Sequence, residues 1–282
     1  MSDPRVHPRR LSRARRAAFR AIEWTAARLG GRRLYRRRHL AAGRFRVRRE
    51  TLVVPGLPAA LAGLRVAQLS DLHAGPFLGA GDLRAVVAAV NAARPDLVVL
   101  TGDYITHEWR DALRVLDELA TLASRGGTWA VFGNHDYRDR LEGRIAEAYA
   151  ARGVHFLRNA GARPLGDALV VTGIEDLEEA RELDVAAARA LLEPGDVELC
   201  LCHNPRGARV LARPGCVAVL SGHTHGMQVD LPFVRRLGPD HPGQRVELGP
   251  TTLIVSAGLG VVGAPWRVGA PAEVVLLELA RA

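Results

Sequence analysis

The chain has 282 residues, of which 48% are hydrophobic, so it can bury a full core in one large domain or two smaller ones. No stretch approaches the roughly 20 apolar residues that a transmembrane helix needs, and the amino-terminal region lacks the apolar segment of a secretory signal. Three cysteines are too few for a disulfide framework and favour a reducing compartment. We therefore expect a cytoplasmic protein.

The net charge of +9 is concentrated near the amino terminus. Residues 1–50 contain 17 arginines and three acidic residues, whereas the remainder of the chain is mildly acidic. Over 11–29, apolar and small residues recur at helical spacing, with arginines mainly on the opposite side. This pattern predicts a basic amphipathic helix within an arm that spans residues 1–43.

The basic arm has three possible partners. A basic amphipathic helix can lie in a membrane interface with its arginines against anionic headgroups, so residues 5–38 are a candidate segment for binding an anionic membrane surface. The protein would then be peripheral at the inner face of the cytoplasmic membrane. Alternatively, the helix packs on the rest of the protein, or the arm neutralises the phosphates of a nucleic acid.

Residues 44–282 have the pattern of one α/β domain, because predicted strands and helices alternate along them. A strand or hairpin is predicted over 44–54. Further strands are predicted at 65–69, 97–100, 128–132, 168–172, 197–202, 217–220, 252–255 and 274–279, and helices at 82–93, at 110–124 and from the segment after 136 to about 152. We expect these elements to form a single domain of the size that enzymes commonly have.

Residues of the kinds that bind metal ions follow five of the predicted strands. They are Asp71 and His73, Asp103, Asn134 and His135, His203, and His223 and His225. A single such residue has an ordinary explanation as a loop cap or turn, but five successive strand ends are hard to explain by chance. Because ligands bind outside the carboxyl ends of strands in open α/β sheets, we expect these side chains to gather at one edge.

The mixture of ligand types indicates which ions would bind. Carboxylate, imidazole and amide groups without thiolate suit Mn²⁺, Fe²⁺/Fe³⁺ or Zn²⁺, whereas an isolated Mg²⁺ usually prefers oxygen ligands only. A structural zinc site is closed by four ligands, and seven candidates are too many for one ion. The sequence therefore predicts two divalent metal ions, about 3.5–4 Å apart, that share a carboxylate.

The order and approximate spacing of these residues resemble those of the calcineurin-like metallophosphoesterases. The matching motifs are Asp71-x-His73, Gly102-Asp103, Gly133-Asn134-His135-Asp136, His203 and Gly222-His223-x-His225. The resemblance covers residues 52–279, and features such as His203-Asn204-Pro205 are similar to the YkuE/YaeI-type branch. That branch usually has two glycines after the last histidine, whereas Gly226 here is followed by Met227, which would reshape the wall of the cleft.

The resemblance implies an α/β fold of four layers, an αββα sandwich of two mixed β-sheets. It assigns Asp71, His73 and His225 to one metal, and Asn134, His203 and His223 to the other, with Asp103 bridging the two ions. It also implies that His135 acts near the leaving group, as a general acid or an electrostatic stabiliser. Asp136 would either orient the imidazole of His135 or cap the following helix.

These inferences predict a dinuclear metal-dependent phosphohydrolase that cleaves a phosphodiester or pyrophosphate bond. Some similar proteins cleave the pyrophosphate of UDP-2,3-diacylglucosamine in lipid A synthesis, and the basic arm fits a membrane-associated, anionic substrate of this kind. The alternatives are a nuclease that acts on DNA or RNA and a non-catalytic scaffold that retains the fold. Few aromatic residues alternate with the arginines, which argues against nucleic acid, and no expected ligand is missing, which argues against a scaffold.

Overall fold

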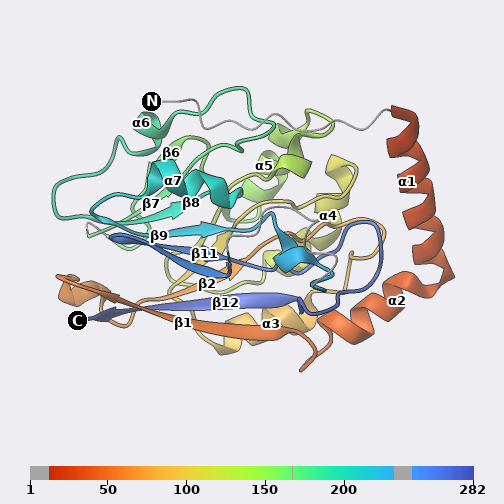
Figure 1. Ribbon diagram of the computed structural model, residues 1–282, viewed down its shortest axis with the longest axis horizontal. Helices are drawn as coiled ribbons and strands as arrows, with labels where there is room; N and C mark the ends of the chain where they lie inside the picture. The colour runs from red at the N-terminus through yellow and green to blue at the C-terminus, as the bar shows by residue number, and fades with distance from the viewer. Residues whose placement is uncertain (1–12, 167, 232–242) are drawn as a thin grey trace.

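The computed structural model describes residues 13–166, 168–231 and 243–282, and its strands form two six-stranded sheets (Figure 1). The first sheet has the order β1-β12-β2-β3-β4-β5. Its strands are β1 (Arg46–Val54), β2 (Arg65–Leu69), β3 (Leu97–Leu100), β4 (Thr128–Ala130), β5 (Val154–Phe156) and β12 (Glu273–Arg281). The sheet is mixed, because β12 runs antiparallel to β2 and the other neighbours are parallel.

The second sheet has the order β10-β11-β9-β8-β7-β6. Its strands are β6 (Ala160–Ala162), β7 (Leu169–Gly173), β8 (Val197–Leu201), β9 (Cys216–Ser221), β10 (Arg245–Leu248) and β11 (Thr251–Val255). The two edge strands β6 and β10 are antiparallel to their neighbours, and the four central strands are parallel. Both sheets are therefore mixed, as the resemblance implies.

An apolar core lies between the two sheets. Val66, Val99 and Leu277 of the first sheet belong to the same buried cluster as Leu199 and Leu220 of the second. The central strands are nearly continuous runs of apolar residues, since side chains on both of their faces are buried. This shared core fixes the position of one sheet against the other, and hence the position of any site that both sheets build.

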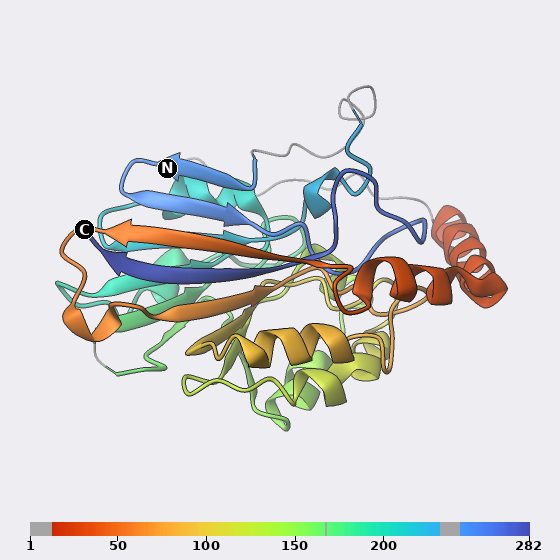
Figure 2. The same ribbon diagram turned by 90° about the horizontal axis from the view of Figure 1, so that it is seen from below.

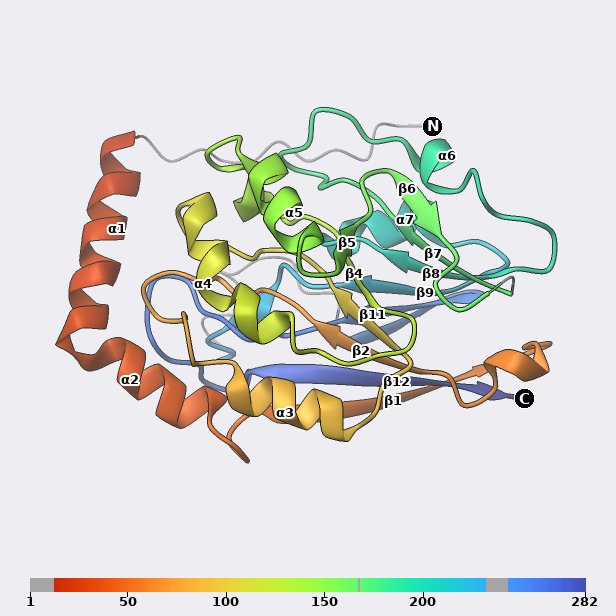
Figure 3. The ribbon, with the colours of Figure 1, turned by 180° about the vertical axis from the view of Figure 1, so that it is seen from behind.

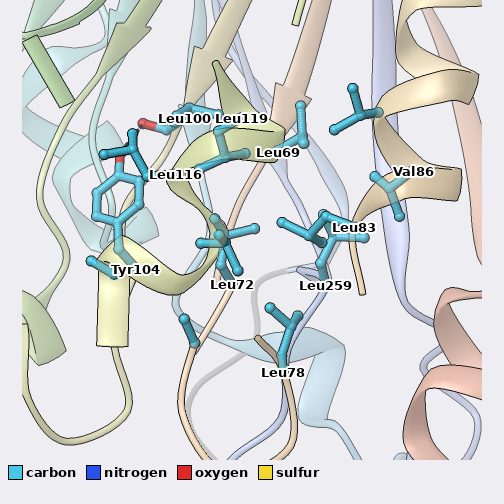
Figure 4. Packing of buried hydrophobic residues seen from close by; sticks show 14 of the residues in the cluster. Leu69, Leu72, Leu78, Leu83, Val86, Leu100, Tyr104, Leu116, Leu119 and Leu259 are labelled. Carbon is cyan, nitrogen blue, oxygen red and sulfur yellow. Dashed lines mark hydrogen bonds between the residues drawn. The ribbon is translucent and has the colours of Figure 1, made fainter. Parts of the chain in front are cut away.

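Helices form the two outer layers of the sandwich (Figure 2). The helices α3 (Arg84–Ala92), α4 (Trp109–Leu119) and α5 (Glu142–Ala150) cover the first sheet (Figure 3). Figure 4 shows this packing, with Leu116 and Leu119 of α4 close to Leu69 and Leu100 of the sheet. The short helices α6 (Val185–Ala188) and α7 (Ala208–Leu211) pack on the second sheet. The four-layer αββα arrangement is confirmed.

Several predicted boundaries were wrong. The predicted strand at 128–132 ends at 130, because the chain leaves the sheet before the glycine that precedes Asn134. The helix predicted up to 152 is two pieces, a single turn at Asn134–Tyr137 and α5, and α4 ends at 119 instead of 124. The strands β6 and β10 were not predicted, because they are short edge strands and the Ala-Gly-Ala of β6 has no apolar alternation.

The amino-terminal segment is helical and bends once. The helix α1 (Arg13–Ala26) is followed by Ala27–Gly31, α2 (Arg32–Tyr35) and Arg36–Leu40, with a kink at Gly30, whose φ of 104° favours glycine. Tyr35 and Leu40 are fully buried in the main core, so the end of the segment is part of the domain. The division between residues 43 and 44 stays a prediction. No helix within the described ranges is long and apolar enough to cross a membrane.

Burial of Leu40 gives a direct test of this packing. The Leu40→Ala variant should lower the free energy of unfolding by about 2–5 kcal/mol, as large-to-small changes in a core do. Leu34, which is 41% exposed on the same helical segment, provides the matched control, and Leu34→Ala should cost roughly 0.5 kcal/mol. Urea denaturation measures both values. Equal effects of the two substitutions would show that the segment does not belong to the core.

Candidate metal centre

The candidate ligands follow strands of both sheets, where the carboxyl ends of these strands meet. They come after β2 (Asp71 and His73), β3 (Asp103), β4 (Asn134), β8 (His203) and β9 (His223 and His225). The ends of three strands of the first sheet and two of the second are thus brought together. The site depends on how the two sheets pack, and not on the edge of one sheet alone.

Four of these residues form a compact group on one side of the site. One ligand atom from each of Asp71, His73, Asp103 and His225 lies within 4.8 Å of the others. The Nε2 atoms of His73 and His225 are 3.0 Å apart, and a carboxylate oxygen of Asp71 lies 3.5 Å from Nε2 of His225. Imidazole nitrogens and carboxylates that converge in this way can share one metal ion.

The remaining candidates lie on the other side of Asp103. The Oδ2 atom of Asp103 is 3.3 Å from Nε2 of His73 and 3.4 Å from Nε2 of His203. Nδ1 of His223 is 3.1 Å from Oδ1 of Asn134, and the rings of His203 and His223 meet edge to face with centroids 5.2 Å apart. Asp103 therefore stands between two sets of potential metal ligands.

The protonation of His203 fits a metal ligand. Its Nδ1 donates to the carbonyl of Thr101 at 2.7 Å, which leaves Nε2 buried and without a hydrogen bond among the described residues. A buried polar atom without a partner is uncommon in proteins, and a ligating histidine is usually fixed in this way by a bond to its other nitrogen. The residues present therefore fit a bound metal ion.

The charged groups of the site shift one another's pKa values. Burial opposes ionisation of both groups, yet the His203 charge holds the pKa of Asp103 well below its usual range, and the Asp103 charge raises the pKa of His203 well above its own. Burial and the neighbouring His73 lower the pKa of His225. A bound metal ion would displace the proton that the charge of Asp103 stabilises on His203.

An outer residue, Glu178, holds His223 in place. Its Oε1 lies 3.2 Å from Nε2 of His223 and accepts a hydrogen bond from the side chain of Asn204 at 3.1 Å. Burial alone would raise the pKa of Glu178, but the hydrogen bond and charge of His223 lower it. The carboxylate keeps the proton of the imidazole on Nε2, so Nδ1 is available to an ion.

The backbone is strained at most of the candidate ligands. Five of them have a left-handed backbone, with φ of 49° at Asp71, 44° at His73, 57° at Asp103, 72° at His223 and 52° at His225. Such a conformation costs on the order of 1–3 kcal/mol per non-glycine residue and persists only where the surroundings enforce it. Strain of this kind is concentrated at functional sites, so the backbone supports the same assignment as the side chains.

The side chain of Asp136 joins the loop that follows β3 to the loop that follows β4. Its Oδ2 accepts the amides of Asp103 at 2.9 Å and Gly133 at 2.8 Å, and its Oδ1 accepts those of Tyr104 at 2.8 Å and Ile105 at 3.3 Å. Both oxygens are thus occupied by backbone amides. We propose that Asp136 positions the loop of Asp103 and caps its own turn, instead of orienting the imidazole next to it.

The imidazole of His135 has a different partner. Its Nε2 lies 2.7 Å from Nη2 of Arg138, and its ring meets that of His73 edge to face at 4.5 Å. Burial, and then the charge of Arg138, lower the pKa of His135 well below the usual value. His135 therefore lies beside the group of ligands that includes His73, and its neutral ring contacts the guanidinium of Arg138.

The sequence did not identify three residues that contact the site: Arg138, Glu178 and Arg267. Arg138 lies three residues after His135, a spacing that one helical turn brings together, and Glu178 belongs to the acidic run that begins at Glu175. No sequence signal marks Arg267, which is buried and donates to the carbonyl of His225 at 3.2 Å. Two further histidines, His107 and His241, lie in predicted loops and could line the cleft on the sequence alone; His107 contacts Glu23 of the amino-terminal helix, and His241 lies outside the described residues.

The fold and this site define a calcineurin-like phosphoesterase. The model of that family matches residues 64–227, and the chain belongs to this family, whose members hydrolyse phosphoric esters. Its relatives place it in the branch that includes YkuE. Beyond this membership, the group of Asp71, His73, Asp103 and His225 is suited to hold a divalent metal ion.

Three relatives illustrate the similarity. The chain is 30% identical to an uncharacterised metallophosphoesterase of Aquifex aeolicus, over 86% of this chain and 94% of that protein. It is 28% identical to the uncharacterised metallophosphoesterase YkuE of Bacillus subtilis, over 79% and 81%. It is 32% identical to a zebrafish (Danio rerio) protein named transmembrane protein with metallophosphoesterase domain, over 81% of this chain. The chain spans just over half the length of that vertebrate relative and its bovine counterpart.

The contact between Glu178 and His223 gives a test of the metal site. The Glu178→Ala variant should bind Mn²⁺ about 10–100-fold more weakly at one of two sites, because the orientation and proton of His223 are no longer fixed. Glu179→Ala is the matched control, since the neighbouring carboxylate pairs with Arg140 instead. Calorimetric titration of the metal-free protein with Mn²⁺ measures both. Equal affinities for the two variants would contradict the role assigned to Glu178.

Proposed function

We propose that the chain is a dinuclear metal-dependent phosphohydrolase that cleaves a phosphodiester or pyrophosphate bond. The observation that carries this proposal is the position of Asp103, whose carboxylate lies between two sets of donors. The imidazole, carboxylate and amide groups suit two ions of Mn²⁺, iron or Zn²⁺. When bound, such ions supply Lewis-acid activation of water and of the phosphate oxygens.

The residues of the chain have separate tasks in this reaction. Asp71, His73 and His225 would hold one ion and Asn134, His203 and His223 the other, while Asp103 contacts both. His135 lies at the edge of the first group, next to Arg138, and so presents a neutral ring and a cation to an anionic substrate. Glu178 and Asp136 act through other residues, by fixing His223 and the loop of Asp103.

Hydrolysis assays test the proposal. Metal-stripped protein is given Mn²⁺ and assayed with bis(p-nitrophenyl) phosphate, p-nitrophenyl phosphate, UDP-2,3-diacylglucosamine, DNA and RNA. We expect Mn²⁺-dependent cleavage of the diester or the pyrophosphate, and a loss of at least about 100-fold in Asp103→Asn, since a shared ligand is removed. Asp117→Asn, at an exposed position on α4, should retain full activity.

Other outcomes of these assays favour the alternatives. Cleavage of DNA or RNA with a steep dependence on salt would indicate the nuclease. An absence of turnover with every substrate, although two ions bind per chain, would contradict the enzymatic proposal and support a scaffold that retains the fold.

We further propose that α1 docks the enzyme on an anionic membrane surface, where a substrate such as UDP-2,3-diacylglucosamine would lie. One polar residue of the helix is buried against the domain: Glu23 is 2% exposed and accepts hydrogen bonds from His107 at 2.5 Å and from the amide of Gly263 at 2.6 Å. Arg20 pairs with Glu108 at 2.5 Å. The helix is thus fixed to the domain by polar contacts of Glu23 and Arg20, and by Ala26, which packs against the main core.

Three large apolar side chains of this helical segment are left in contact with solvent. Phe19 is 52% exposed, Ile22 62% and Leu29 83%, and the helix stands at one end of the molecule (Figures 1 and 2). Exposed arginines flank these side chains, among them Arg16 and Arg28. Apolar side chains with flanking arginines suit an interface of acyl chains and anionic headgroups, whereas a second copy would bring two arginine-rich helices together.

Vesicle binding tests the docking surface. Replacement of Phe19, Ile22 and Leu29 by serine should weaken binding to vesicles that contain phosphatidylglycerol by at least about tenfold, since each buried apolar side chain contributes up to about 1.5–3 kcal/mol. Leu191→Ser is the control, because Leu191 is 47% exposed and lies outside the segment. Unchanged binding of the triple variant, or equal binding of the native protein to neutral vesicles, would contradict the proposal. Deletion of residues 1–50 is unsuitable, because it removes Tyr35, Leu40 and half of β1 from the core.

A further inference from the structure

The guanidinium of Arg138 is held beside the metal centre by two neutral groups. Its Nη1 donates to the carbonyl of Thr106 at 2.7 Å, and its Nη2 lies 2.7 Å from Nε2 of His135. An arginine can only donate hydrogen bonds, so Nε2 of His135 accepts and the proton of that ring lies on Nδ1. Because His135 packs edge to face on His73, a single imidazole ring separates Arg138 from the first group of ligands.

Arg138 has no ion-pair partner among the described residues, and the charges of Asp103 and Glu23 act on it only from a greater distance. No carboxylate in the described part of the chain lies within ion-pair distance of its guanidinium. Arg140, two residues later, shows the usual arrangement, because it pairs with Glu179 at 3.1 Å. A cation at the edge of an active site without an acidic partner is suited to an anionic ligand.

The side chain of Arg138 still has hydrogen-bond donors to offer. A guanidinium has five N–H groups, and the contacts with Thr106 and His135 use two of them. Part of the side chain is exposed. Desolvation is the main reason that the pKa of Arg138 is lowered; the charges of Asp103 and Glu23 oppose this change, and the positive charge of Arg16 on α1 adds to it. Arg16 is thus close enough to contribute to the same positive field.

We propose that Arg138 binds the second, non-reacting phosphate of a substrate that contains a pyrophosphate. The inference rests on the proposed function and specifies its substrate class. The two phosphates of a pyrophosphate are adjacent, so a substrate with one phosphate at the metal centre has the other within reach of a guanidinium one ring away. The planar fork of arginine can donate two parallel hydrogen bonds to such a phosphate. A simple phosphodiester has no group for this site.

Competitive inhibition by nucleotides tests the inference with the native metal-loaded enzyme. UDP and UMP differ by one phosphate, and each is used to inhibit hydrolysis of bis(p-nitrophenyl) phosphate at a fixed concentration of free Mn²⁺. The native enzyme should bind UDP at least about tenfold more tightly than UMP, and Arg138→Gln should lose most of this preference. Arg138→Lys keeps the charge but loses the planar guanidinium, so its preference for UDP should lie between those of the native enzyme and Arg138→Gln. Arg140→Gln is the matched control and should keep the native preference.

The ratio of the two inhibition constants separates binding from structure. If Arg138 only holds His135, its replacement changes the inhibition by UDP and UMP in the same proportion, and the ratio stays native. A native ratio in Arg138→Gln, or no preference for UDP in the native enzyme, would overturn the inference. Failure of the native enzyme to hydrolyse the diester is a separate result, which would overturn the proposed function before any variant is compared.

Discussion

The structure depends on one shared carboxylate, that of Asp103. It lies 3.3 Å from His73, which follows a strand of the first sheet, and 3.4 Å from His203, which follows a strand of the second. Two sets of donors can meet at one carboxylate only if the two sheets are fixed against each other, and the apolar core between them does this. The geometry of the metal centre thus depends on the packing of the sandwich, because a shift of one sheet would separate the two sets of donors.

The loops of the site are held in a conformation that they would not adopt alone. Five candidate ligands have a left-handed backbone, and the buried carboxylate of Asp136 binds the amides around Asp103. Close packing adds to this, since a Cβ atom at Gly222 would lie 2.0 Å from the hydroxyl of Ser70. Folding therefore supplies the energy that pre-organises the ligands, which lowers the reorganisation needed when ions and substrate bind.

The sequence predicted the local features of this protein better than the tertiary ones. The grouping of Asp71, His73 and His225 could be predicted because their motifs follow apolar strands, and the sandwich followed from the family resemblance. The orientation of α1 could not be predicted, since the amphipathic pattern defines two faces but not which one meets the domain. Glu23 is buried in hydrogen bonds with the domain, whereas Ile22 and Leu29 are exposed. Glu178 and Arg267 were missed because each reaches the site through a contact distant in sequence.

The central claim is that two metal ions share Asp103, and electron paramagnetic resonance of the Mn²⁺-loaded protein tests it most directly. The account predicts that two Mn²⁺ bind per chain and give the spectrum of a coupled pair, because ions that share a carboxylate lie about 3.5–4 Å apart. In Asp103→Asn, which removes the shared charge, the coupled signal should be lost or strongly reduced. A single bound Mn²⁺ in the native protein, or two ions with the spectrum of isolated centres, would contradict the account.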